Sequence, residues 1–252
     1  MRHIDNQKYT LEICANSIAS AISAQEGGAD RIELCNNIEQ GGTTPSIGTI
    51  IEVKKRLNID VFVLIRPRSG DFFYNTTDFE IMMKDTEECG KIGCPGVVFG
   101  ILTKTGEIDI ERNKDLLSMA RSYGMEATFH RAIDRTRDIF RSSEQVIKLG
   151  FDRILTSGGY PTAEEGINNI LKMNNLYSQS IKIMPGSGIT PQNIRHIAQS
   201  TGANEFHGTF STKTQHQNIS FNPKMKGEEY GYKTDLEKVM QAKKILNELN
   251  RR

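Results

Sequence analysis

The sequence predicts a single (β/α)₈ barrel, an α/β fold of the TIM-barrel type, with one extra helix at its C-terminal end. Short apolar runs alternate with segments of helical periodicity, and eight such units fit the 252-residue chain as one domain. The strands are expected to begin near Leu11, Arg31, Val61, Gly96, Glu126, Arg153, Ile181 and Glu205. Eight units of this kind favour parallel strands, which need crossover connections. An open doubly wound sheet, which usually has fewer strands, is the alternative.

The segments between the expected strands carry apolar residues at helical spacing. The pattern predicts helices over 47–57, where Pro45 lies near the start, and over 77–92. A last helix is expected over 234–250. The aperiodic stretch 210–233 after the eighth strand is expected to be a long loop. Such a loop is either a flap over the barrel mouth or a disordered segment.

Composition and charge exclude several classes of protein. The 32 Lys and Arg residues nearly balance the 31 Asp and Glu residues, so no overall field attracts nucleic acid or an anionic membrane. The N-terminal residues lack the apolar stretch of a signal peptide, and the apolar runs are too short to span a membrane. Four cysteines do not suggest a disulfide framework. We therefore expect a cytoplasmic protein with reduced thiols and with no nucleic-acid or membrane partner.

The first two expected strands carry the same pattern of a glutamate and a cysteine two residues apart. Alternation places Glu12 and Cys14, and likewise Glu33 and Cys35, on the face that points into the barrel. This departs from the usual barrel interior, which is filled by branched apolar residues. A buried carboxylate is costly unless it is paired. The partners expected for the two glutamates are Arg66, His130 or Arg131.

Further polar residues and two glycine-rich turns follow the C-terminal ends of the other strands, where barrels carry their functional groups. Either these groups form a structural ion-pair network or they form a ligand site, and their number favours the site. The turns at 157–159 and 186–188 expose backbone N–H groups that can hold phosphate or carboxylate, although glycine is also common in any tight turn. The candidate binding residues are Arg66, Arg68, Arg131, Ser157, Gly158, Gly159, Gly186, Gly188 and His207.

The cysteines fall into two pairs. Cys14 and Cys35 lie on neighbouring expected strands, which run about 4.8 Å apart. Two thiolates at such a separation suit a soft, low-coordinate ion such as Cu(I), whereas the alternative is two small buried hydrophobic side chains. Two ligands are too few for a structural zinc site. Cys89 and Cys94 are expected at the opposite end of the barrel, as packing residues.

The sequence resembles the CutC copper-homeostasis family over about residues 10–210. The resemblance rests on ordered blocks: LEICANS (11–17), GGADRIELCNN (27–37), EQGGTTPS (39–46), VLIRPRSGDFFY (63–74), GVVFGILT (96–103), TFHRAID (128–134), FDRILTSGGYPTA (151–163), IMPGSGIT (183–190) and EFHGT (205–209). It implies a TIM barrel in the cytoplasm, a homodimer or higher homo-oligomer, and intracellular copper handling. The cysteines that the family is proposed to use for Cu(I) correspond to Cys14 and Cys35.

Two functions are therefore expected. The first is Cu(I) binding through Cys14 and Cys35, without turnover. The second is an enzyme that acts on a small anionic metabolite, phosphorylated or carboxylated, held by Arg66 and the two turns. Its acid–base pair would be Glu12 or Glu33 with His130. No pattern in the sequence fixes a reaction. The candidate catalytic residues are Glu12, Glu33, His130 and Asp134.

Overall fold

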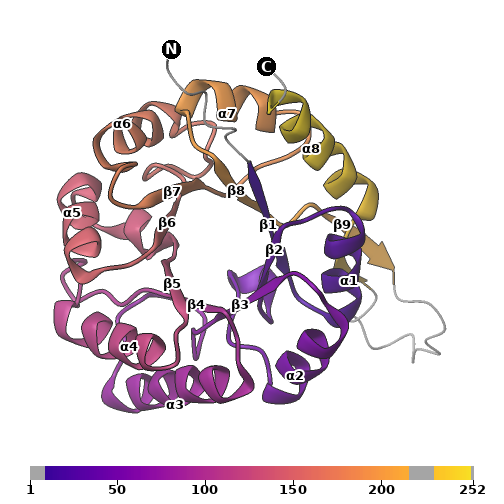
Figure 1. Cartoon of the computed structure of the whole chain (residues 1–252). Coiled ribbons are helices and arrows are strands. Elements are labelled where there is room, and N and C mark those ends of the chain that lie inside the picture. The colour runs from indigo at the N-terminus through magenta and orange to yellow at the C-terminus, as the bar shows by residue number, and fades with distance from the viewer. Residues whose placement is uncertain (1–8, 216–229, 251–252) are drawn as a thin grey trace, which may run out of the picture.

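The computed structural model describes residues 9–215 and 230–250, and its centre is a barrel of eight parallel strands surrounded by helices (Figure 1). Hydrogen-bonded neighbours follow chain order from β1 to β7, and β8 pairs with β1 on its other side. The two ends of this order, β7 and β8, lie next to each other, so the barrel is nearly closed (Figure 1). The prediction of a TIM barrel with an extra C-terminal helix is confirmed.

The eight barrel strands begin within one residue of the predicted positions. They are β1 (Thr10–Ala15), β2 (Arg31–Leu34), β3 (Asp60–Leu64), β4 (Gly96–Phe99), β5 (Glu126–Phe129), β6 (Arg153–Thr156), β7 (Lys182–Pro185) and β8 (Glu205–Gly208). The helices are α1 (Ile18–Glu26), α2 (Ile47–Arg56), α3 (Thr76–Ile92), α4 (Ile110–Ser122), α5 (Ile139–Leu149), α6 (Ile167–Tyr177), α7 (Ile194–Thr201) and α8 (Leu236–Leu249). Two short 3₁₀ helices, η1 (Ile38–Gln40) and η2 (Arg131–Arg135), follow β2 and β5.

The core has two parts, and strand alternation separates them. Leu11 and Ile13 of β1 belong to the large apolar layer between the strands and the helices. Cys14, Cys35 and Phe62 belong to a second, smaller apolar cluster in which Leu64 and Val98 complete the set. The prediction that the Glu-apolar-Cys pattern turns its cysteines away from the outer layer is thus confirmed.

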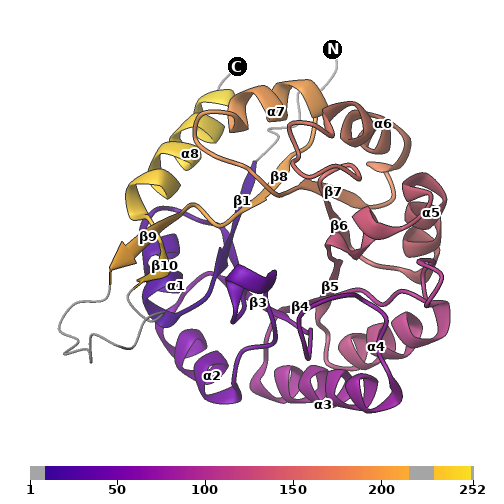
Figure 2. The ribbon, with the colours of Figure 1, turned by 180° about the vertical axis from the view of Figure 1, so that it is seen from behind.

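The C-terminal part departs from the expected long loop. Its described ends form two antiparallel strands, β9 (Ser211–Gln215) and β10 (Tyr230–Thr234), beside α1 (Figure 2). The Thr234 amide donates to the Ser20 hydroxyl at 3.2 Å, which attaches β10 to α1. The rest of the expected flap, residues 216–229, lies outside the described residues. Helix α8 then covers the gap between α1 and α7 (Figure 1).

The ring of Phe62 lies inside the barrel, and its position requires a glycine on the neighbouring strand. Phe62 pairs with Gly96 in the β3–β4 register, and a side chain on Gly96 would begin 2.5 Å from the Phe62 ring. The guanidinium groups of Arg31 and Arg153 lie 4.9 and 5.0 Å from the ring centroid. The ring therefore supports two buried charges, and Gly96 supplies the space for it.

We predict that Gly96→Ala destabilises the fold by about 1–3 kcal/mol, because the added methyl group overpacks the interior against Phe62. Phe62→Leu in the same chain should recover part of this loss, so the double variant should be more stable than the sum of the single variants indicates. Urea unfolding followed by circular dichroism measures the free energy of unfolding of all three. Additive losses would show that Phe62 is not the residue that requires Gly96.

Candidate functional site

An open cavity of about 1310 Å³ lies at the C-terminal ends of the strands, where the sequence predicted the site. Cys14, Glu33 and His207 line it from β1, β2 and β8. The loops after β3, β5, β7 and β8 form further walls. Because these residues lie near the C-terminal ends of their strands, the barrel interior forms the floor of the cavity.

Below this floor, four charged side chains form a buried ion-pair network. Arg31 pairs with Glu12, and its Nη2 lies 2.8 Å from Glu205 Oε2. Arg153 Nε lies 3.1 Å from the same Glu205 oxygen. All four residues are buried. The two arginines therefore share Glu205, and Glu12 depends on Arg31 for much of the compensation that a buried carboxylate requires.

The partners of Glu12 differ from the prediction because strand register decides them. Glu12 lies beside Arg31 on β2 and beside His207 on β8. Arg31 shares the inward face of β2 with Glu33, so alternation from Glu33 could have placed Arg31 in the interior. The apolar pattern predicts Arg31 only as the first residue of a strand and gives no partner for it. The residues wrongly predicted to neutralise Glu12 are Arg66, His130 and Arg131.

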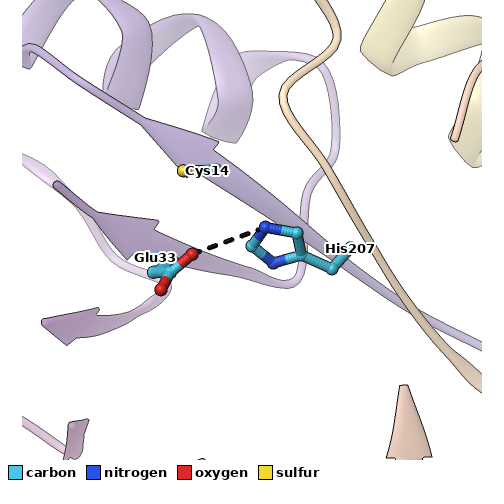
Figure 3. A group of neighbouring side chains, drawn as sticks. All are labelled: Cys14, Glu33 and His207. Atoms are coloured by element: carbon cyan, nitrogen blue, oxygen red, sulfur yellow. Dashed lines mark ion pairs between the residues drawn. The ribbon is translucent and has the colours of Figure 1, made fainter. Parts of the chain in front are cut away.

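Cys14, Glu33 and His207 form a buried group whose sulfur, oxygen and nitrogen atoms all lie within 4.8 Å of one another. Glu33 and His207 face each other across 3.4 Å, with the Cys14 sulfur beside them (Figure 3). His207 Nδ1 lies 2.7 Å from Glu12 Oε1, which orients the ring. The Cys35 sulfur lies 3.4 Å from that of Cys14. Cys14 is thus the residue that the cysteine pair and the mixed group have in common.

Burial and neighbouring charges give the two glutamates opposite pKa shifts. Burial disfavours the Glu12 carboxylate, but the charge of Arg31 and the His207 hydrogen bond hold its pKa well below the usual value. Burial raises the pKa of Glu33, and the charge of Glu12 raises it further. The interior therefore contains one firmly ionised carboxylate and one that takes up a proton more readily.

His207 and Cys14 both hold their protons more tightly than in water. Burial alone would lower the His207 pKa, yet the Glu12 hydrogen bond and the charge of Glu33 raise it. The hydrogen bond with Cys35 and burial raise the pKa of the Cys14 thiol well above its usual value. A metal ion that binds here must therefore displace protons.

The predicted anion turn at 157–159 already binds a carboxylate of the chain itself. Asp134 accepts hydrogen bonds from the amides of Ser157 and Gly159 at 3.0 Å each, and Thr156 Oγ1 donates to it at 2.5 Å. Arg131 Nε lies 3.0 Å from the same side chain. These N–H groups are the anion nest that the sequence predicted, but Asp134 occupies it and fixes the loop after β5 to the loop after β6.

The remaining candidates divide between the cavity wall and the surrounding loops. Arg66, His130 and Gly188 line the cavity. Gly186 donates its amide to the Thr156 carbonyl at 2.9 Å. Arg68 is not among the described lining residues, because it pairs with Asp71 and Asp78. Cys89 and Cys94 are buried in the outer apolar layer, away from Cys14 and Cys35.

We predict that Glu12→Gln lowers the free energy of unfolding by about 3–5 kcal/mol at pH 7, because it leaves buried charges without their partner. Glu33→Gln is the matched control, and its cost should be about 1 kcal/mol or less, since burial already favours the neutral form of Glu33. Chemical denaturation measures both. Equal losses would contradict this division of roles.

The pH dependence of the Glu12 contribution has a definite sign. Its folded pKa lies below the ordinary value of 4.5, so the stabilisation is present above pH 4.5 and is lost as the pH falls through the folded pKa. The difference in stability between wild type and Glu12→Gln should therefore shrink in acid. A difference that grows in acid would show that Glu12 is protonated in the folded protein.

Comparisons with known proteins place this geometry in a family. The CutC family model matches residues 9–212. A CutC family protein from Xanthomonas axonopodis pv. citri is 47% identical over 199 residues, which cover 79% of this chain and 82% of that protein. One from Xylella fastidiosa is 42% identical over 240 residues, covering 94% of this chain and 89% of that protein.

Solved structures agree with the sequence relatives. The CutC structure from Streptococcus agalactiae has a TM-score of 0.76 at 36% identity and covers 80% of this chain and 98% of its own. Phosphoribosyl anthranilate isomerase from Thermotoga maritima has a TM-score of 0.60 at 12% identity, covering 95% and 99%, which shows a shared fold alone. Within the described residues, no helix has the length and apolar character needed to cross a membrane. The chain belongs to the CutC family.

Proposed function

We propose that this CutC family protein binds Cu(I) at the floor of the barrel cavity, through the sulfur atoms of Cys14 and Cys35. The observation that carries the proposal is the 3.4 Å separation of two buried sulfurs at the cavity floor. Thiolates are the ligands that Cu(I) prefers. Copper homeostasis is the role named for the Streptococcus agalactiae relative, and a Cu(I) site would give this chain the same role.

The donor atoms around Cys14 fit a soft ion and offer it a third ligand. A ring nitrogen of His207 lies within 4.8 Å of the Cys14 sulfur, and imidazole also binds copper. The carboxylate of Glu33 completes a different set of sulfur, nitrogen and oxygen donors, which suits Zn(II). The two metals would share Cys14 but differ in the other ligands, so variants of Cys35 and Glu33 separate them.

The enzyme alternative from the sequence stays a prediction. Its acid–base pair was expected to join Glu12 or Glu33 with His130, whereas the histidine that contacts both glutamates is His207. A proton could move between Glu33 and His207, whose pKa values are both raised. This geometry specifies no reaction. The homo-oligomer and the cytoplasmic location likewise stay predictions.

We predict that the wild-type protein binds one Cu(I) per chain and that Cys14→Ser/Cys35→Ser abolishes this binding, because both soft ligands are lost. Anaerobic titration against a chromophoric Cu(I) chelator measures the affinity. Cys89→Ala is the control, since it removes a buried thiol outside the cavity. Glu33→Gln should weaken Zn(II) more than Cu(I). If the double variant binds Cu(I) as the wild type does, the proposed site is wrong.

Copper binding should strengthen as the pH rises. The thiol of Cys14 and the ring of His207 have raised pKa values, so an ion that binds them competes with protons. We expect the logarithm of the association constant to rise by about one unit per pH unit for each proton released between pH 6 and 8. If His207 is a ligand, His207→Gln should reduce this slope. An affinity independent of pH would contradict binding through Cys14.

A further inference from the structure

A buried arginine in the cavity wall pairs with no carboxylate that the structure describes. Arg66 is 4% exposed, and within residues 9–215 and 230–250 no acidic side chain forms an ion pair with it. Its Nη1 and Nη2 donate to the carbonyls of Gly42 at 2.5 Å and Gly70 at 2.8 Å. By contrast, Arg31 and Arg153 each contact two carboxylates. A buried cation of this kind is costly unless an anion compensates it.

Two buried N–H donors on this wall also lack acceptors. Arg66 Nε and His130 Nε2 have no hydrogen-bond partner among the described residues, and the Tyr74 hydroxyl, near the Arg66 side chain, is also unpaired. His130 Nδ1 accepts from the Ala132 amide at 3.3 Å, so the ring proton is assigned to Nε2. Burial and the charge of Arg66 lower the His130 pKa to about 3, which leaves a neutral ring that can donate from Nε2 at pH 7. Most buried donors in proteins are satisfied, so two such donors indicate a ligand.

The ring of Phe72 joins these two residues into one region. It lies 5.1 Å from the Arg66 guanidinium carbon and 4.7 Å from the His130 ring, measured to centroids. Phe72 also lines the cavity and is only half-buried. The ring therefore packs against both residues, and all three line the same cavity.

The cavity as a whole is positive and larger than a metal ion requires. Five cations line it, namely Arg66, Lys104, Arg131, Arg135 and Lys238, and of these Arg131 is paired with Asp134. Its two acidic lining residues are Glu33 and Asp71, and Asp71 is paired with Arg68. Its volume of about 1310 Å³ exceeds the roughly 300–1,000 Å³ that small-molecule sites usually have. We call the part of the cavity beside Arg66, Phe72 and His130 the upper cavity. The features above favour an organic anion over a bare cation as its occupant.

We propose that the upper cavity binds a small organic oxyanion, a carboxylate or a phosphate ester, whose charged end is held by Arg66 and His130. The arginine supplies charge and the free Nε–H, and His130 donates from Nε2. Both groups bind oxygen atoms of either ligand class, so the shared chemistry is that of an oxyanion. The proposed oxyanion donors, Arg66 and His130, are different residues from the proposed Cu(I) ligands.

Inorganic phosphate and malonate are the probes, titrated by calorimetry at constant ionic strength against sodium chloride. We expect binding of at least one of them, and Arg66→Gln should weaken it about tenfold or more, because a hydrogen bond to a charged group is lost. Arg68→Gln is the matched control: it removes the same charge from the same loop but from a residue that pairs with Asp71 and Asp78. It should retain the wild-type affinity.

His130→Asn tests the second donor without removing the cap of η2. Its amide oxygen can still accept from the Ala132 amide, as asparagine does at helix N-caps, while the Nε2 donor is lost. Affinity should fall although the protein remains folded. In the wild type, ¹⁵N-labelled histidine should show a change at His130 Nε2 when the anion binds.

Three outcomes would overturn the proposal: no binding of either probe beyond that of chloride, equal weakening by Arg66→Gln and Arg68→Gln, or no change at His130. Preference for phosphate or for malonate identifies the ligand class. Cys14→Ser/Cys35→Ser should bind the anion with wild-type affinity. Failure of the anion site and failure of the copper site are therefore distinguishable.

Discussion

The ion pair between Arg31 and Glu12, inside the barrel, is the interaction on which the candidate site depends. A charge in this position would be unfavourable without a partner, and Arg31 compensates both Glu12 and Glu205. Once Glu12 is held ionised, it accepts a hydrogen bond from His207 and fixes the orientation of that ring. His207 in turn faces Glu33 beside Cys14. The lower network therefore positions the groups that a ligand would meet.

The floor and the wall of the cavity differ in charge because their arginines have different partners. In the ion-pair network below the floor, Arg31 and Arg153 both have carboxylate partners, so the network is nearly neutral. The donor atoms available to a ligand at the floor are sulfur and nitrogen atoms. In the cavity wall, the guanidinium group of Arg66 donates its hydrogen bonds to carbonyl groups. No acidic residue that the structure describes neutralises its charge. The proposed soft cation at the floor and the proposed oxyanion at the wall follow from this difference in donors and charge.

The fold could be read from the sequence because its signals are local. Apolar runs and helical periodicity located each strand, and the alternation of Glu12 with Cys14 gave the inward face. The partners could not be read in this way, because they depend on register between strands that are distant in the chain: Glu12 and His207 are 195 residues apart. Asp134 in the turn at 157–159 is a second case, since no short-range pattern links a carboxylate to N–H groups 23 residues later.

The positive wall also constrains how a metal ion could reach the thiols. Cys14 lines the cavity and is 9% exposed, whereas Cys35 is fully buried, so an ion from solvent reaches the pair through the cavity. Arg66, Lys104 and Lys238 line this cavity, and their charges repel a free cation. An ion carried in a negatively charged complex meets attraction instead. For the proposed Cu(I) site, these charges therefore favour delivery of the ion in an anionic complex over capture of the free ion.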